Sequence, residues 1–270
     1  MKALSLLGLM TLAQLSVAQT NLTGHAADLF KQAQAGKHYA VAAQLHPEIL
    51  PTSDGQSFYA VWRANGTNAP EHWIASTHGS GGFATDDLAI WSKHLAGRDI
   101  GLVSMQWWLG GANERDSYYR PEQVYREIDL ALQKLGVKPG TVMFHGFSRG
   151  SANSYAIAAL DAGRGKKYFA LNVASSGGVA LDYPPTRAIT NGAYGDRPLR
   201  GTRWVTAAGG RDQNPDRDGT PAMKRAAAWL KEQGATVEFS IEDPNGGHGA
   251  LMLNPANAKR VLDLFLAGKR

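Results

Sequence analysis

A serine between two glycines, at 146–150, is the residue of this 270-residue chain whose surroundings best suit nucleophilic chemistry. The segment reads Gly-Phe-Ser-Arg-Gly, with Ser148 at its centre, and it lies between an apolar run at 141–144 and a small-residue stretch at 151–158. This order predicts a strand, a sharp turn and a helix, which together expose the serine hydroxyl at the edge of a sheet. The helix N-terminus also favours the negative charge that develops during acyl transfer. We therefore expect Ser148 to be a nucleophile.

A nucleophilic serine needs a general base and an acid that orients that base. The only histidine downstream of Ser148 is His248, which lies in the glycine-rich segment 244–249 after a predicted strand. Asp212 follows a predicted strand at 202–208, between the serine and the histidine in the chain. Serine, acid and histidine in this order, each after a strand, predict a triad of Ser148, Asp212 and His248.

Three other carboxylates compete for the role of the acid. Asp216 and Asp218 lie further along the chain than Asp212, towards the next predicted helix. Asp243 shares a loop with His248 and lies too close to it in the sequence. Asp212, directly after its strand, is the preferred acid.

The same segment also has a partial calcium pattern. Asn214, Asp216, Asp218 and Gly219 occupy the first, third, fifth and sixth positions of an EF-hand loop. The twelfth position, which needs a bidentate glutamate, is Arg225. We therefore expect no metal here.

Two backbone N–H groups are expected to form an oxyanion hole. One belongs to Arg149, directly after the nucleophile. The other comes from the turn His-Gly-Ser-Gly-Gly at 78–82, where either Gly79 or Ser80 is suitably placed. His78 and His145 each end a predicted strand, and we expect them to support their loops.

Aromatic residues follow the predicted strand at 99–105. Trp107 and Trp108, in the segment 106–111, and the segment Ser-Tyr-Tyr-Arg at 117–120 flank a loop at the sheet edge where ligands bind, so they are candidates for a substrate-binding wall. Packing in the core explains two tryptophans equally well, and both interpretations stay open. The segment 175–198 is expected to be irregular and to form a small cap over the site.

Strands and helices alternate over most of the chain, which predicts an α/β fold with a mostly parallel sheet and helices on both faces. The pattern predicts one catalytic domain at 19–270, without a large lid. Predicted strands occupy 56–63, 71–77, 99–105, 141–145, 168–173, 202–208 and 235–241. Predicted helices occupy 26–35, 86–95, 121–135, 151–162, 221–233 and 255–266.

Composition excludes several classes of protein. Hydrophobic residues make up 43% of the chain and charged residues 19%, so it can bury a core and is not disordered. The formal charge is +5, with no basic stripe, and we expect no nucleic-acid partner. There is no cysteine, which excludes disulfides and thiolate metal sites.

The first eighteen residues read as a signal peptide. Lys2 precedes an apolar stretch at 3–15, and Ser-Val-Ala at 16–18 fits the small-x-small cleavage pattern. The stretch is too short to span a membrane, and no later segment has about 20 uninterrupted apolar residues. We expect a secreted or periplasmic protein without a membrane span.

These motifs together resemble the α/β-hydrolase superfamily, over nearly the whole chain after the leader. The resemblance is to secreted serine carboxylesterases of the polyhydroxybutyrate-depolymerase and feruloyl-esterase type. It implies that Ser148 attacks the carbonyl of a small or oligomeric ester, that His248 transfers the proton and that Asp212 orients His248, with no cofactor or metal. One departure is Ser80, which interrupts the glycine run of members with a full HGGG turn.

Two other functions remain open at this point. A serine peptidase resembling the catalytic domain of the prolyl oligopeptidase group would use the same triad on peptide bonds, although that group normally carries a propeller domain. A secreted binding protein on the hydrolase scaffold would keep the residues without turnover.

Overall fold

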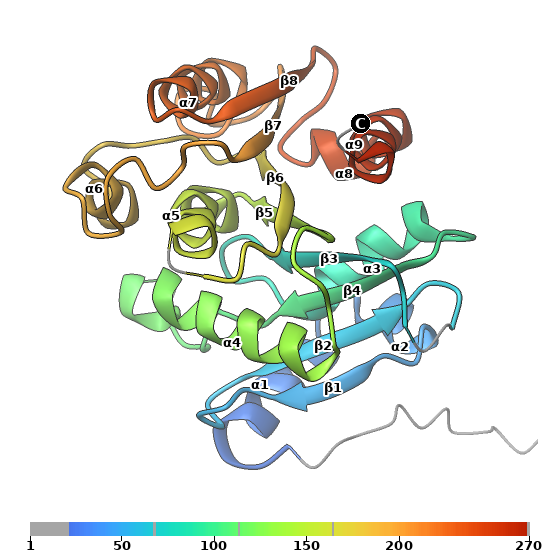
Figure 1. The fold of residues 1–270 in the computed structure, drawn as a ribbon. Coiled ribbons are helices and arrows are strands. Elements are labelled where there is room, and N and C mark those ends of the chain that lie inside the picture. Colours follow the sequence, from blue (N-terminus) through green and yellow to red (C-terminus); the bar gives the residue numbers. More distant parts are fainter. Residues whose placement is uncertain (1–21, 67–68, 113, 164, 269–270) are drawn as a thin grey trace, which may run out of the picture.

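A twisted β-sheet organises the computed structural model, which describes residues 22–66, 69–112, 114–163 and 165–268 (Figure 1). The strands follow the spatial order β1-β2-β4-β3-β5-β6-β7-β8. Their bounds are β1 (Glu48–Pro51), β2 (Phe58–Arg63), β3 (His72–Thr77), β4 (Ile100–Met105), β5 (Val142–Phe147), β6 (Phe169–Ser175), β7 (Arg203–Gly209) and β8 (Thr236–Asp243).

Pairing in this sheet is mostly parallel, as expected. Strand β2 pairs antiparallel with both β1 and β4, whereas every pair from β4 to β8 is parallel. The carboxyl ends of the parallel strands therefore meet at one edge, where loops from different parts of the chain come together.

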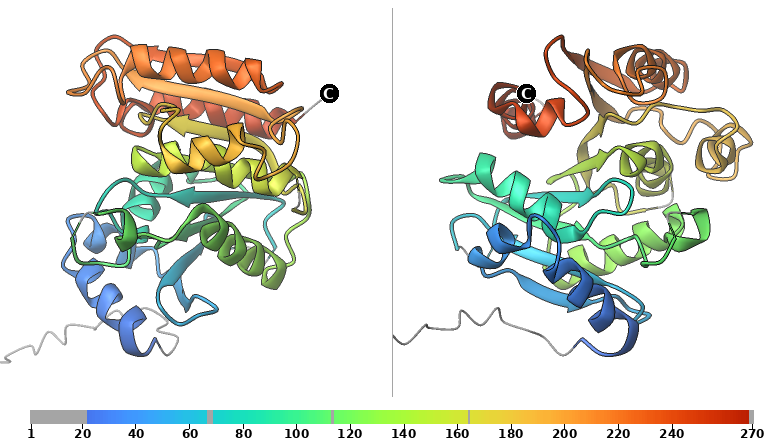
Figure 2. Two further views of the ribbon diagram at one scale, coloured as in Figure 1. Left: turned by 90° about the vertical axis from the view of Figure 1, so that its left-hand side faces the viewer. Right: turned by 180° about the vertical axis from the view of Figure 1, so that it is seen from behind.

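Helices cover both faces of the sheet, and the three buried clusters show which helix packs where. One face is covered by α1 (Gly24–Gln34), α2 (Tyr39–Gln44), α3 (Ala84–Leu95), α8 (Ala250–Leu253) and α9 (Pro255–Ala267). The other is covered by α4 (Pro121–Lys134), α5 (Arg149–Gly163), α6 (Pro184–Thr190) and α7 (Thr220–Glu232). The left view of Figure 2 faces the side covered by α4 to α7, and its right view, from behind, has α9 and α7 on opposite sides of the sheet. The predicted α/β class and single domain are confirmed.

Helix α5, which begins directly after Ser148, is buried along most of its length. Small residues such as Ala156, Ala158 and Ala159 let it pack closely between the sheet and its neighbours, and all three are fully buried. Helices α4 and α6 flank it on the same face. This burial fixes the start of α5, which follows Ser148 directly.

Four short elements were absent from the predicted pattern: β1, α2, α6 and α8. The prolines at 47 and 51 argued against a strand at the position of β1. Pro51 is its last residue, however, and β1 is an edge strand, where a missing N–H is tolerated. Helix α6 lies inside 175–198, which was expected to be irregular, and Pro184 at its first position starts it.

Among the described residues, no helix is long and apolar enough to cross a membrane. The predicted signal peptide, 1–18, lies outside the described residues.

Candidate active site

Ser148 lies in the tight turn between β5 and α5, with a φ of 54°. Few residues other than glycine adopt this left-handed region, so the turn is strained. The flanking glycines are required by space, because a Cβ at Gly146 would lie 2.5 Å from the carbonyl oxygen of Gly150. A Cβ at Gly150 would lie 2.3 Å from the carbonyl oxygen of Thr77. The predicted strand, turn and helix around the serine are therefore present.

The three residues of the expected triad lie in hydrogen-bond contact. His248 Nε2 is 2.9 Å from Ser148 Oγ, and His248 Nδ1 is 2.7 Å from Asp212 Oδ2. A carboxylate only accepts hydrogen bonds, so Nδ1–H donates to Asp212 and Nε2 accepts from the serine hydroxyl. This arrangement can remove a proton from Ser148 as it attacks an electrophilic carbon.

Burial differs between the two partners of the bond from His248 to Asp212. The Asp212 side chain is 1% exposed, whereas that of His248 is 37% exposed. The acid is therefore shielded from water, while the imidazole opens onto the pocket that contains Ser148. The other oxygen of Asp212 accepts the N–H of Asn214 at 2.9 Å, which fixes the carboxylate.

The rival carboxylates occupy different positions. Asp216 is 91% exposed and faces Arg225, whose guanidinium also donates to the Asp216 carbonyl. Asp218 is buried and accepts from Arg217 Nε and Nη2 at 2.8 and 2.7 Å. Asp243 does not contact His248 and serves its loop, as described next.

The loop that carries His248 is held by Asp243 at the end of β8. One carboxylate oxygen of Asp243 accepts the backbone N–H groups of Asn245 and Gly246, at 3.1 and 2.9 Å. The other accepts from the side-chain amides of Asn254 and Asn257, at 2.7 and 3.1 Å. Chiefly through the Asn254 bond, these contacts lower the pKa of Asp243, so the carboxylate holds the loop even in mild acid.

The turn at 78–82 lies on the opposite side of Ser148, between β3 and α3. A Cβ at Gly79 would lie 3.1 Å from the Cβ of Ser148, so the two segments touch. Gly79 and Ser80 line the same pocket as Ser148. The two turn residues expected to supply the oxyanion N–H are therefore beside the nucleophile, and Arg149 follows it as the first residue of α5.

Two aromatic side chains hold this turn. Trp107 Nε1 donates to the carbonyl oxygen of His78 at 2.9 Å, and the Tyr118 hydroxyl accepts the N–H of Gly81 at 2.7 Å. The two rings pack against each other with centroids 4.6 Å apart. Sequence reasoning placed Tyr118, in the segment 117–120, among the candidates for a substrate-binding wall and did not predict its contact with Gly81, which lies 37 positions earlier in the chain.

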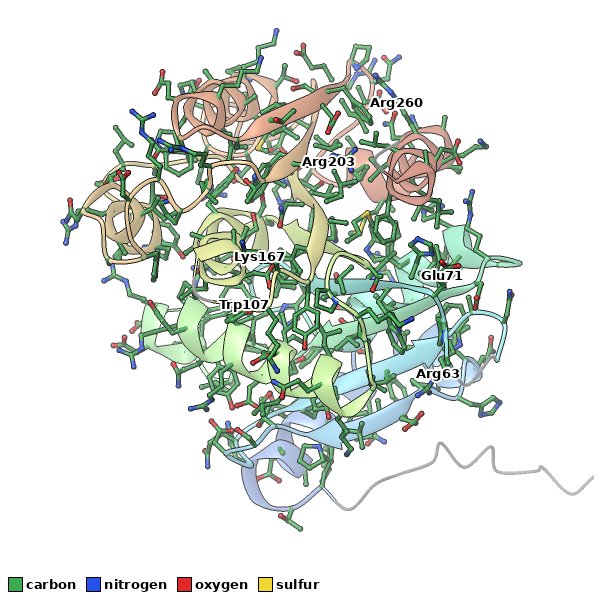
Figure 3. The ribbon with its side chains drawn as sticks, in the orientation of Figure 1. Arg63, Glu71, Trp107, Lys167, Arg203 and Arg260 are labelled. Carbon is green, nitrogen blue, oxygen red and sulfur yellow. The ribbon has the colours of Figure 1, made fainter. Side chains whose placement is uncertain are left out.

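The two predicted substrate-binding tryptophans differ in position. Trp107 is 1% exposed and belongs to the core under α4, although it reaches the pocket wall (Figure 3). Trp108 is half-buried, packs against Phe83 with ring centroids 5.6 Å apart, and is not among the residues that line the pocket.

His78 and His145 are both fully buried. Burial lowers the pKa of His78 to about 4 and that of His145 to about 3, so both rings are neutral near pH 7. His78 Nδ1–H donates to the carbonyl of Gly79 at 2.8 Å, and His145 Nδ1 accepts from Trp91 at 3.2 Å. Neither lines the pocket.

The pocket around Ser148 has a volume of about 1260 Å³. Besides Ser148 and His248, its wall includes Tyr183, Pro184 and Tyr194 from the segment 175–198, which therefore covers part of the site. The covering segment includes α6, which lies on the outer side of α5 in Figure 1.

One group of possible metal ligands stands out among the described residues. Donor atoms of Asp212, Asp218 and His248 lie within 4.8 Å of one another. Each of these side chains already has a close partner: Asp212 and His248 bind each other, and Asp218 binds Arg217. The geometry therefore fits a proton-transfer pair better than an ion site.

Comparisons of the fold with solved structures identify similar proteins. The esterase of the archaeon Pyrobaculum calidifontis matches with a TM-score of 0.60 and 14% identity, over 90% of this chain and 92% of that one. Acyl-protein thioesterase 2 of Zea mays matches with a TM-score of 0.53 and 19% identity, over 77% and 97%. A phospholipase/carboxylesterase of Dyadobacter fermentans matches with a TM-score of 0.51 and 15% identity, over 74% and 91%.

These likenesses establish the fold. The chain has the α/β-hydrolase fold, with the sheet and helix arrangement of those structures. No protein-family model and no curated protein matches its sequence.

Proposed function

We propose that the chain is a serine hydrolase that cleaves carboxylic esters. The observation that carries this proposal is the continuous contact from Asp212 through His248 to Ser148, at 2.7 and 2.9 Å. Three solved structures with this fold are named as an esterase, a thioesterase and a phospholipase/carboxylesterase, and their names agree with that chemistry.

The reaction proceeds in two halves. Ser148 Oγ attacks the ester carbonyl carbon while its proton passes to His248 Nε2. The carbon–oxygen bond to the alcohol then breaks, and His248 returns the proton to the departing alcohol. Water attacks the resulting acyl-enzyme by the same proton path, which releases the acid and restores Ser148. Asp212 keeps the imidazole in the required tautomer and stabilises its charged form.

Charge on the tetrahedral oxygen needs donors that are already in place. The N–H of Arg149 at the start of α5 and the N–H of Gly79 or Ser80 are the proposed pair. The start of a helix carries partial positive charge, which favours an oxyanion. Tyr118 and Trp107 keep the turn in position through the bonds to Gly81 and His78.

The experiment is a panel of p-nitrophenyl acetate, butyrate and octanoate with the purified protein. We expect turnover that is lost, by about 10³-fold or more, in Ser148→Ala. The matched control is Ser154→Ala, which removes a hydroxyl from α5, the helix after Ser148, at a position outside the pocket, and it should retain turnover. Circular dichroism verifies that both variants fold. If the folded protein leaves every ester intact but cleaves short peptide p-nitroanilides, the peptidase function replaces this one.

Finer features belong to the same proposal. The resemblance to polyhydroxybutyrate-depolymerase and feruloyl-type esterases, and export through the predicted signal peptide at 1–18, remain predictions. N-terminal sequencing of protein recovered from the producing cells tests export, with a mature start at Gln19 as the expected result.

A further inference from the structure

Arginines gather around the pocket that contains Ser148. Those that line it are Arg115, Arg120, Arg149 and Arg217. The carboxylates that line it are Glu122, Asp182 and Asp218. The Arg217 guanidinium is engaged with Asp218, so these two charges offset each other. Glu122 Oε1 accepts a hydrogen bond from the Tyr194 hydroxyl at 2.6 Å.

Arg149 is the arginine closest to the nucleophile in the chain. Its Cζ lies 4.4 Å from the centre of the Tyr118 ring, and Nη1 donates to the carbonyl oxygen of Glu114 at 3.4 Å. The ring face restricts where the guanidinium can lie. The positive charge is therefore held in a defined place on the wall of the pocket.

Tyr183 contacts the first turns of α5, the helix that begins at Arg149. Its hydroxyl accepts a hydrogen bond from Asn153 Nδ2 at 2.9 Å, and both residues line the pocket. Burial raises the pKa of Tyr183, and among the opposing effects are the charges of Arg149 and Arg115. Asn153 Nδ2 also donates to the carbonyl oxygen of Arg149 at 2.8 Å, so Tyr183 lies beside the start of α5. Arg115, in the short 3-10 helix Arg115–Ser117, directly follows Glu114, whose carbonyl oxygen accepts from Arg149.

We propose that Arg115, Arg149 and Tyr183 form a carboxylate-binding subsite, and that the preferred ester carries a carboxylate besides the bond to be cleaved. This inference deepens the proposed ester hydrolysis and rests on it. A guanidinium donates charge-assisted hydrogen bonds in a fork that matches a carboxylate, and a phenol hydroxyl adds one further donor.

The test compares charged and neutral esters of matched shape. On the acyl side, the mono-p-nitrophenyl ester of adipic acid is compared with its methyl-capped, uncharged form. On the alcohol side, 4-acetoxybenzoate is compared with 4-acetoxybenzamide. In each pair, the quantity measured is the ratio of kcat/KM for the charged ester to that for the neutral one, so the two arms show which side of the ester carries the carboxylate.

Three variants test the residues. Arg115→Gln and Arg149→Gln each remove one positive charge, and the latter retains the backbone N–H proposed for the oxyanion hole. We expect each to lower the ratio about tenfold in one of the two arms. Arg149→Lys keeps a charge but not the fork, and it should recover part of the ratio. Arg187→Gln, an exposed arginine of α6 outside the pocket, is the matched control and should not change the ratio.

Salt supplies a second readout. Arg115 is exposed, so added NaCl should raise the KM of the charged ester in the wild type and leave that of the neutral ester unchanged. If both ratios stay the same in Arg115→Gln and Arg149→Gln, the subsite is refuted. The proposed hydrolysis is tested separately, because wild-type turnover of the neutral esters that is lost in Ser148→Ala holds whether or not the subsite exists.

Discussion

The two loops on either side of Ser148 are held by side chains of different kinds. The His248 loop is fixed by polar bonds to Asp243, close to it in the chain, and it leaves the imidazole 37% exposed. The turn at 78–82 is fixed by the aromatic pair Trp107 and Tyr118, which comes from a distant segment, and its own His78 is fully buried. In the proposed mechanism the imidazole takes up and returns a proton, whereas the backbone N–H donors must stay fixed at the position of the developing oxyanion. The difference follows from what each loop contributes.

We call the His248 loop, with Asp243 and Asp212, the polar side of the site. Substitution of Asp212 should have the largest effect on it. In Asp212→Asn the amide can donate to His248 Nδ1, which favours the wrong imidazole tautomer, and kcat should fall about 10³- to 10⁴-fold. Steady-state kinetics on p-nitrophenyl butyrate measures this. Asp218→Asn is the matched control, because Asp218 is the buried neighbour bound to Arg217. An equal loss in both variants would contradict the assignment of the acid.

Loss of the Asp243 carboxylate should loosen the His248 loop. Asp243→Ala removes four hydrogen bonds at once, so we expect kcat to fall about 10- to 100-fold through misplacement of the imidazole. The Asp263→Ala variant, which changes an exposed aspartate on α9, should keep the wild-type kcat. A wild-type kcat in Asp243→Ala would show that the loop holds itself without this network.

We expect a smaller effect on the aromatic side of the site, which is the turn at 78–82 with Trp107 and Tyr118. Tyr118→Phe removes only the hydroxyl that accepts the Gly81 N–H, so the ring packing remains and kcat should fall about three- to tenfold, with little change in KM. Tyr125→Phe removes a hydroxyl that binds Asp161 outside the pocket and serves as the control. A change confined to KM would assign Tyr118 to substrate binding instead of the turn.

The smallest expected effect is on the pH dependence of stability, and it comes from His145, which is buried in β5. His145 has a pKa lowered to about 3, so below about pH 6.5 the unfolded chain binds a proton that the folded protein does not. This residue therefore lowers the free energy of unfolding as pH falls from about 6.5 towards 3, by a few kcal/mol at most. In His145→Gln that contribution is absent. As pH falls, the free energy of unfolding should therefore decrease more steeply in the wild type than in the variant. Urea unfolding at pH 7 and pH 5 measures the difference, and parallel slopes would refute it.

Local patterns predicted the polar half of the site. Glycines around Ser148, a single downstream histidine and a carboxylate directly after a strand are all visible within short windows, and the three side chains lie together. The aromatic half was not predictable in the same way. Tyr118 meets Gly81 only because β4 and β3 are neighbours in the sheet, and no local pattern encodes that contact.

The fold shows the same division. The parallel strands, with their apolar runs and regular alternation with helices, were recognisable, whereas the edge strand β1 contains a terminal proline and pairs with only one neighbour. Short helices such as α2 and α8 take their stability from packing more than from their own six or four residues, so sequence period does not reveal them.

The most direct test of the central claim is covalent labelling of the nucleophile. The folded protein is treated with a fluorophosphonate, digested, and the modified residue is located by mass spectrometry. We predict a single adduct on Ser148 that is absent in Ser148→Ala and forms much more slowly in His248→Ala. A folded wild-type protein that takes no label, or that takes it at another serine, would contradict the proposed nucleophile.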